Sequence, residues 1–328
     1  MRLLSLLYGT GSVPRTLITG GLGQLGRGLA KALRGKYGQE NVILSDIIKC
    51  PDATVKPYEY VDVLDMKQLD TVVVTHEIDR VVHFSALLSA VAEKNVPRAL
   101  QVNATGFQNI VEVCARHNLM LFCPSTIGAF GPTSPRHPTP DLTIQRPTTI
   151  YGVTKVYMEL LGEYYHHKFG VNFRSLRFPG VISADTKPGG GTTDYAVHIF
   201  HAAKDTGHYK CFLREDTMLP MMYLPDTIRS AVEVMDVPEE KLKLRVYNVT
   251  AMSFTPAQLL EEMKPYYPNL TVEYESDSRQ QIADTWPEVF DDSGARNDWG
   301  WSHGYDLPKL VRTMVTRIDP DNPHLRTL

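Results

Sequence analysis

The chain has 328 residues, of which 43% are hydrophobic and 22% are charged, an ordinary composition for a globular protein. A formal net charge of −3 gives no sign of a nucleic-acid partner, and the longest apolar runs are too short to cross a bilayer. The four cysteines are widely spaced and include no Cys-x-x-Cys pair, so they indicate reduced thiols rather than a metal site.

The N-terminal segment differs in composition from the rest of the chain. "MRLLSLLYGTGSVPR" contains two arginines and several hydroxyl residues but no acid, as mitochondrial transit peptides do. Residues 1–13 are therefore a candidate leader, which predicts a mitochondrial location. The alternative is a tail that leads into the first strand of a cytoplasmic protein.

Beyond this segment, strand-like apolar runs alternate with helical patterns. The alternation predicts right-handed βαβ crossovers and an α/β fold with a doubly wound parallel sheet. Because the pattern loosens after residue 180, we expect a nucleotide-binding domain over 14–180 and mainly a smaller mixed substrate lobe over 181–328. A late strand near 244–250 should return to the sheet. The predicted strands cover residues 15–20, 41–46, 58–63, 78–86, 119–125 and 171–180, and the predicted helices cover 22–33, 65–75, 96–117 and 150–169.

The stretch "TLITGGLGQLG" places three glycines, Gly20, Gly23 and Gly26, between the first strand and the first helix. Side chains there would block the chain reversal, keep a pyrophosphate off the backbone and hold the helix off the sheet. The helix N-terminus offers N–H groups and a partial positive charge to phosphates. The spacing differs from Gly-x-Gly-x-x-Gly, but its context predicts a Rossmann-type dinucleotide site formed by Gly20, Gly23, Gln24 and Leu25.

Two acids follow the next two strands. Asp46 comes 26 residues after Gly20, where a carboxylate can accept hydrogen bonds from both ribose hydroxyls of an adenosine. It would repel a 2′-phosphate, which favours NAD over NADP. The alternative is a turn aspartate that caps the next segment. Asp62 follows the third strand and is either a contact for the adenine amino group or a plain loop acid.

The stretch "YGVTK" places Tyr151 and Lys155 four residues apart in a predicted helix, so both side chains lie on one face. An ammonium beside a phenol favours the phenolate, which makes a general base usable near neutral pH. Ser125 and Thr126 fall where the fifth strand ends, and a hydroxyl there can bind a substrate oxygen or cap a turn. Tyr-x-x-x-Lys alone is common, and its weight comes from following the glycine motif.

With Asn103 in "VNATG", these motifs resemble the extended short-chain dehydrogenase/reductase family over nearly the whole chain. Two later stretches, "KPGGGTTDYAVHIF" and "RQQIADTWPEVFDDSGARNDWGW", resemble the branch of that family that oxidises L-threonine with NAD. The resemblance implies oxidation of the threonine 3-hydroxyl to give 2-amino-3-oxobutanoate. It also implies a homodimer joined by the helices near 96–117 and 150–169, and the eukaryotic members of this branch are mitochondrial.

The resemblance also implies a role for each candidate residue. Tyr151 takes the hydroxyl proton and Lys155 holds the nicotinamide ribose. Either Ser125 or Thr126 binds the hydroxyl oxygen, and the choice between them stays open. Asn103 anchors a water that relays the proton outward. The cofactor contacts are completed by Ser85 and Ala86, at the end of the strand over 78–86.

The substrate itself needs groups for its charged ends. Thr192 and Thr193, in a glycine-rich loop, can supply donors for the carboxylate, although a plain solvated loop fits the same residues. Ser89 is a weaker candidate of this kind. Trp286 can close over the threonine methyl, but a tryptophan in a small lobe is more often part of the core.

Three other interpretations are weaker. His198 and His201 lie three residues apart on one helical face, but no third ligand follows nearby, so we expect no metal. A nucleotide-sugar epimerase or dehydratase would keep the same motifs, but the short glycine–threonine loop argues against a second diphosphate site. A non-catalytic NAD-binding regulator would commonly lack Tyr151 or Lys155, and both are present.

Overall fold

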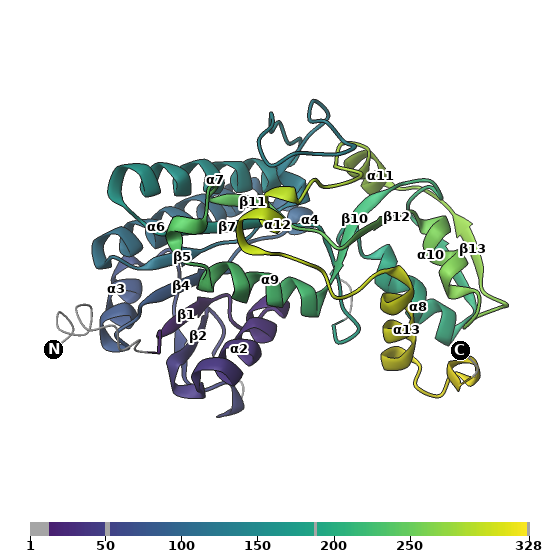
Figure 1. Ribbon diagram of the computed structural model, residues 1–328, viewed down its shortest axis with the longest axis horizontal. Coiled ribbons are helices and arrows are strands. Elements are labelled where there is room, and N and C mark those ends of the chain that lie inside the picture. The colour runs from purple at the N-terminus through teal and green to yellow at the C-terminus, as the bar shows by residue number, and fades with distance from the viewer. Residues whose placement is uncertain (1–12, 50–52, 187–188, 327–328) are drawn as a thin grey trace.

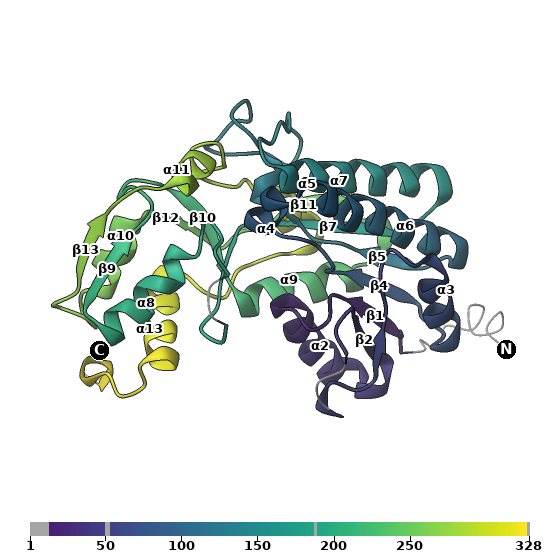
Figure 2. The same cartoon turned by 180° about the vertical axis from the view of Figure 1, so that it is seen from behind.

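The structure is a computed structural model that describes residues 13–49, 53–186 and 189–326. The candidate leader over 1–13 lies outside these ranges except for Val13. Figures 1 and 2 show a larger body built on one twisted sheet and a smaller lobe beside it, which contains the C-terminus.

The sheet of the body is parallel throughout, with strand order β11-β7-β5-β4-β1-β2-β3 and the short β6 paired with β7. An order with the first strand in the middle is that of a doubly wound Rossmann-type fold, so the predicted fold class is confirmed. The strands are β1 (Thr16–Thr19), β2 (Val42–Asp46), β3 (Tyr58–Tyr60), β4 (Arg80–His83), β5 (Met120–Phe122), β6 (Ser125–Thr126), β7 (Phe173–Phe178) and β11 (Val246–Asn248).

Helices cover both faces of this sheet. α2 (Gln24–Tyr37) and α9 (Leu224–Asp236) lie side by side on one face, and α3 (Met66–Thr75), α6 (Gly106–His117) and α7 (Ile150–Phe169) cover the other (Figure 1). Each helical layer buries its own apolar core against the strands. Both α9 and β11 follow residue 181, so the second half of the chain contributes to the body. The division of roles at residue 180 stays a prediction.

The helix predicted over 96–117 is divided into three parts. It begins as α5 (Val96–Ala99), continues as a π-helical segment (Leu100–Thr105) and ends as α6. The wider π turn contains Asn103, which is buried. Segments of this kind are frequent at functional sites because they redirect side chains. The short α4 (Ser89–Lys94) precedes them.

The lobe has two small sheets and an apolar core of its own. One sheet has the order β12-β10-β8 and the other pairs β13 with β9. Its core is formed largely by α8, α10 and α13 packed on these strands. The elements of the lobe are β8 (Gly180–Ile182), α8 (Tyr195–Asp205), β9 (His208–Cys211), β10 (Leu219–Tyr223), β12 (Met252–Phe254), α10 (Pro256–Met263), β13 (Thr271–Tyr274), α11 (Ser278–Ala283) and α13 (Leu307–Ile318). The short α12 (Ser293–Trp299) lies between α11 and α13 in sequence but packs on β11 of the body.

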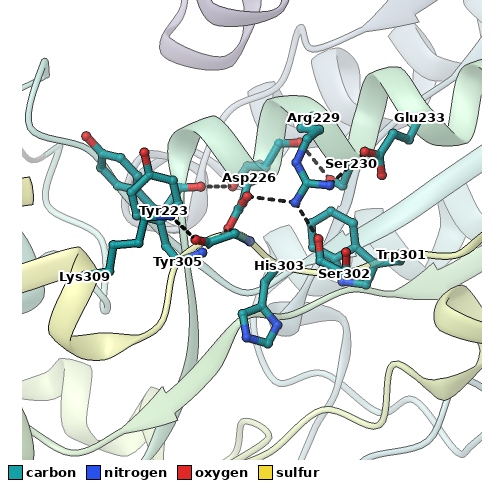
Figure 3. Close-up of polar contacts among 12 residues, drawn as sticks. Tyr223, Asp226, Arg229, Ser230, Glu233, Trp301, Ser302, His303, Tyr305 and Lys309 are labelled. Carbon is teal, nitrogen blue, oxygen red and sulfur yellow. Dashed lines mark hydrogen bonds and ion pairs between the residues drawn. The ribbon is translucent and has the colours of Figure 1, made fainter.

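The first turn of α9 holds the segment that returns from α12 to α13. The buried carboxylate of Asp226 accepts hydrogen bonds from the backbone N–H groups of Gly304 (2.8 Å) and Tyr305 (3.0 Å). Figure 3 shows Asp226 between Tyr305 and Arg229. Arg229 donates to the same carboxylate at 2.9 Å, and its guanidinium lies 4.8 Å from the centre of the Trp301 ring. Because the buried acid is fully hydrogen-bonded, it can fix this segment to the body.

One buried acid gives the stability of the fold a pH dependence. Burial raises the pKa of Asp141 from 3.8 to about 6, although its hydrogen bond from Asn248 and the charge of Arg177 oppose the shift. The folded state therefore holds a proton that the unfolded state releases, and this contribution to stability is lost as the pH rises from about 4 to about 6. Over this range the wild type should lose about 2–3 kcal/mol in its free energy of unfolding through this group, and Asp141→Asn should not show that loss.

Urea unfolding at a series of pH values measures this effect. The difference in the free energy of unfolding between Asp141→Asn and the wild type should grow in favour of the variant between pH 4.5 and pH 7. A difference that stays constant with pH would contradict the assignment.

Candidate active site

A cavity of about 690 Å³ lies at the carboxyl edge of the parallel sheet, where the body meets the lobe. Ligands of doubly wound folds bind at this edge. Each lining segment follows a strand of the body, begins α7 or comes from the lobe. The lining segments are 20–26 after β1, 84–91 after β4, 124–127 around β6, Tyr151 and Lys155 on α7, 178–181 after β7, Thr186 with residues 189–194, and Trp286.

The turn after β1 has no room for side chains at two of its glycines. Gly20 has φ +65°, and a Cβ there would lie 2.7 Å from the backbone nitrogen of Ser85. A Cβ on Gly26 would lie 2.5 Å from the carbonyl oxygen of Gly20. The first turn of α2 therefore sits directly on the glycine turn, and both sit against the end of β4.

This packing leaves the N-terminus of α2 open toward the cavity. Gly23 is the N-cap residue, and no side chain caps the helix there. Gly23, Gln24 and Leu25 all line the cavity, as predicted for phosphate contacts. Uncapped N–H groups together with the helix dipole make this end a site for an anion such as a pyrophosphate.

The two predicted adenosine contacts lie beside this turn. Asp46 ends β2, and its carboxylate accepts hydrogen bonds from the backbone N–H groups of Leu22 (3.2 Å) and Ile47 (2.8 Å). Asp62 accepts one from Leu64 at 3.0 Å. The structure thus fixes Asp46 to the glycine turn, whereas Asp62 is held within its own loop.

A second, very small chamber lies behind Lys155. It has a volume of about 10 Å³, roughly the space of one water, and is lined in part by Ser85, Ala86 and Asn103. Asn103 holds the segment after β4, since its amide donates to the carbonyl of Leu87 (3.0 Å) and accepts from its N–H (2.8 Å). Ala86 lines both cavities.

The first turn of α7 presents the predicted catalytic pair to the main cavity. A Cβ at Gly152 would lie 2.1 Å from the carbonyl oxygen of Gly128, so the helix sits directly on that backbone. Lys155 is buried, and its ammonium donates to the carbonyl of Pro124 (2.6 Å) and lies 5.8 Å from the centre of the Tyr151 ring. Both side chains line the cavity.

The groups behind Lys155 are neutral. Burial, and to a smaller extent the charge of Lys155, lowers the pKa of His83 to about 3. The neutral imidazole shares a hydrogen bond of 2.8 Å with the hydroxyl of Thr19. Burial raises the pKa of Cys123 to about 11, so its thiol keeps its proton. The ammonium of Lys155 therefore has no ionised partner among these residues.

The two neighbouring hydroxyls at the end of β6 have different partners. The buried Ser125 donates its hydroxyl hydrogen to the carboxylate of Glu159 on α7. Thr126 accepts a hydrogen bond from the backbone N–H of Gly128 at 3.1 Å, and its own hydrogen has no acceptor among the described residues. Of these two hydroxyl groups, only that of Thr126 thus keeps a hydrogen to donate into the cavity.

The four residues predicted to hold the ends of the substrate, Ser89, Thr192, Thr193 and Trp286, all line the cavity, as do Ser125, Thr126 and Tyr151. The loop that carries the two threonines is closed by Asp194, whose carboxylate accepts two hydrogen bonds of 2.7 Å from the backbone N–H groups of residues 190 and 191. Thr186 of this loop is hydrogen-bonded to Gln24, beside the glycine turn. Lys187 and Pro188, quoted above in the same loop, lie outside the described residues.

Sequence reasoning missed several lining residues. Their only signal is position, because most of them lie at or just beyond the carboxyl ends of β4, β5, β6 and β7, and Asp194 lies beside the two threonines of the glycine-rich loop. They are Phe84, Leu87, Leu88, Val91, Pro124, Ile127, Phe178, Pro179, Gly180, Val181 and Asp194.

Two broader features can be stated for residues 13–49, 53–186 and 189–326. No group of three or more histidine, cysteine or acidic side chains in these ranges is arranged to hold a metal ion. None of the helices in these ranges is long and apolar enough to pass through a membrane.

Comparison with known proteins agrees with this geometry. Residues 16–250 match the NAD dependent epimerase/dehydratase family. The chain is 59% identical over 304 residues to "L-threonine 3-dehydrogenase, mitochondrial" of Bos taurus. The matched region covers 92% of this chain and 82% of that protein.

Solved structures give the same result. The L-threonine dehydrogenase of Phytophthora infestans is 47% identical to this chain and superposes with a TM-score of 0.91. The match covers 93% of this chain and 99% of that one. The holo form of an L-threonine dehydrogenase from Cupriavidus necator is 45% identical, with a TM-score of 0.91 and coverages of 93% and 100%. The chain belongs to the NAD dependent epimerase/dehydratase family, and NAD is its cofactor.

Proposed function

We propose that this protein is an L-threonine 3-dehydrogenase, which oxidises L-threonine to 2-amino-3-oxobutanoate with NAD+. The observation that carries the proposal is the single cavity shared by the glycine turn, the Tyr151–Lys155 pair and the threonine-bearing loop. The Bos taurus and Sus scrofa relatives, which match 92% and 95% of the chain, carry this name.

The reaction removes a hydride from C3 of threonine and a proton from its hydroxyl. Bound NAD+ supplies the hydride acceptor. Tyr151 takes the hydroxyl proton as a general base, and Lys155, whose ammonium lies 5.8 Å from the centre of the Tyr151 ring, would hold the nicotinamide ribose. A water in the small chamber beside Asn103 passes the proton outward.

We assign the contact with the substrate hydroxyl to Thr126 rather than to Ser125. Thr126 can donate a hydrogen bond to the alcohol oxygen and support the developing ketone. Ser125 has already donated its hydrogen to Glu159. The spacing that is usual in the short-chain dehydrogenase/reductase family, counted back from Tyr151, also points to Thr126, which stands 25 residues before it.

The remaining groups hold the ends of the substrate. Thr192 and Thr193 donate to the carboxylate, Ser89 supports the same end, and Trp286 covers the methyl group. Trp286 is 7% exposed and belongs both to the cavity wall and to the apolar core of the lobe. The glycines of the loop that carries Thr192 and Thr193 would let it shut over the substrate and exclude water from the reacting atoms.

The test of the function is a substrate screen. Threonine with NAD+ should produce NADH, detected by its absorbance, and NADP+ should be used poorly. Turnover of a UDP-sugar without any oxidation of threonine would instead favour an epimerase. Binding of NAD+ without turnover of either would favour a non-catalytic regulator.

Asp46 gives a sharper prediction about the cofactor. We expect Asp46→Ala to weaken NAD+ binding about tenfold to a hundredfold, because the hydrogen bonds to the adenosine ribose are lost. Discrimination against NADP+ should fall, since the charge that repels a 2′-phosphate is gone. Fluorescence titration with both cofactors measures the two constants. Glu40→Ala, which removes an exposed acid before β2, is the matched control, and equal effects of the two changes would refute the role of Asp46.

We also propose a homodimer formed by the helices near 96–117 and 150–169. Its support is an exposed apolar strip on α7, where Val153, Leu160 and Tyr164 are 46%, 59% and 53% exposed. Val96 and Leu100 are also exposed nearby. Apolar surface of this kind marks an interaction site. Sedimentation equilibrium should give twice the chain mass, and a monomer at micromolar concentration would refute the dimer.

We propose a mitochondrial location. Its support is the composition of residues 1–13 and the word "mitochondrial" in the names of the Bos taurus and Sus scrofa relatives. A fusion of the first residues to a fluorescent protein should enter mitochondria, and a cytoplasmic fusion would favour the alternative.

A further inference from the structure

A third side chain shares the face of α7 that carries Tyr151 and Lys155. Glu159 follows Lys155 by four residues and is 1% exposed. Its carboxylate accepts hydrogen bonds from both Nε (2.9 Å) and Nη2 (2.8 Å) of Arg177, which lies on β7 and is also buried. The mechanism above uses neither residue.

The same carboxylate has two further donors. Gln145, in the segment before α7, donates at 2.9 Å, and Ser125 at the end of β6 donates its hydroxyl hydrogen. Arg177 in turn donates to the carbonyl of Asp141 (2.7 Å) and the side chain of Asn248 on β11 (3.2 Å). This polar cluster therefore ties α7 to β6, β7 and β11.

A buried ion pair of this kind is weak support for stability alone, because apolar side chains of similar size often serve the fold equally well. What the cluster supplies is a fixed position of the end of β6 relative to α7. Ser125 precedes Thr126, and Glu159 is on the helix of Tyr151. A hydrogen bond between Ser125 and Glu159 thus fixes the strand end that carries the donor relative to the helix that carries the base.

We propose that Glu159, through Ser125, is a positioning residue that sets the distance between Thr126 and the phenol of Tyr151. The proposal rests on the proposed function, since it assumes that a substrate hydroxyl binds between these two groups. A misplacement of about 1 Å in such an arrangement can cost about a hundredfold in rate.

The first test is Ser125→Ala, which removes the link and leaves the Glu159–Arg177 pair intact. The expected result is a kcat about tenfold to a hundredfold lower, with little change in KM for threonine, in Kd for NAD+ or in Tm. A purely structural role would lower Tm and leave kcat of the folded enzyme unchanged. A kcat within twofold of the wild type would overturn the proposal.

The second test separates positioning from direct contact. In a Thr126→Val background, adding Ser125→Ala should lower kcat by less than twofold further, because the group being positioned is already gone. Losses that multiply would show that Ser125 contacts the substrate itself, and would overturn the proposal.

The third test addresses Glu159. Glu159→Gln should lower kcat in the otherwise wild-type enzyme. In a Ser125→Ala background it should lower kcat no further, even if Glu159→Gln lowers Tm in both backgrounds. Glu163→Gln, one turn further along α7, is the matched control and should keep the wild-type kcat. An equal loss of kcat from Glu159→Gln with and without Ser125 would overturn the proposal. Failure of the wild type to oxidise threonine would refute the proposed function instead.

Discussion

Replacing Tyr151 by phenylalanine should lower kcat for threonine by about 10²–10⁴-fold, because the general base is removed while the ring remains. The affinity for NAD+ should change little, since the glycine turn and Asp46 are untouched. Steady-state NADH formation and a separate NAD+ titration measure the two effects.

The structure offers a matched control on the same helix. Tyr164→Phe removes an equivalent hydroxyl at a position that does not line the cavity and is 53% exposed in the single chain, and it keeps the ring that belongs to the proposed dimer contact. It should keep nearly the wild-type kcat. If both variants are equally active, Tyr151 is not the base.

Replacing Gly26 by alanine should reduce both stability and cofactor binding. The added Cβ would lie 2.5 Å from the carbonyl of Gly20 and 2.7 Å from the Cα of Gly21, which are backbone atoms that cannot turn aside. We expect a cost of about 1–3 kcal/mol in the free energy of unfolding. Displacement of α2 from the glycine turn should weaken NAD+ binding at least about tenfold, since its N-terminus is proposed to face the phosphates.

The control for this change lies on the same helix. Gly35 is exposed, and apart from its chain neighbours and the nearby backbone of α2, no atom lies within 4 Å of a Cβ built there. Gly35→Ala should raise stability by about 0.5–1 kcal/mol, because alanine favours the helix more than glycine does. Chemical unfolding and NAD+ titration of both variants check the pair of expectations. Equal stability and equal NAD+ affinity of the two variants would show that the close contact at Gly26 is unimportant.

The parts of the site that could be predicted from sequence are local in the chain. The glycine turn, Asp46 and the Tyr151–Lys155 pair each depend on a few neighbouring residues and on the strand or helix beside them. The bounds of α7 were predictable for the same reason. Thr149 caps its first turn by accepting from the N–H of Gly152, and Gly170 ends it with φ +72°.

The parts that could not be predicted depend on contacts between distant segments. The surroundings of Glu159 come from α7, β6, β7 and the segment before α7, and no local pattern brings these together. The difference between Ser125 and Thr126 follows from those contacts, so the sequence left it open. The π-helical turn around Asn103 has no comparable local signal, because its helical periodicity resembles that of an ordinary helix.

The position of β11 has a consequence for synthesis of the chain. Its residues Val246–Asn248 pair with β7, which ends about seventy residues earlier. While the ribosome is still making the segment between β7 and β11, the outer side of β7 has no neighbour, and α2 lacks the cover that α9 later provides. A nascent chain at this stage exposes an unpaired strand edge and apolar helix surface, both of which promote aggregation. Translation beyond about residue 250 is therefore needed before β11 can pair with β7 and take its place at the edge of this sheet.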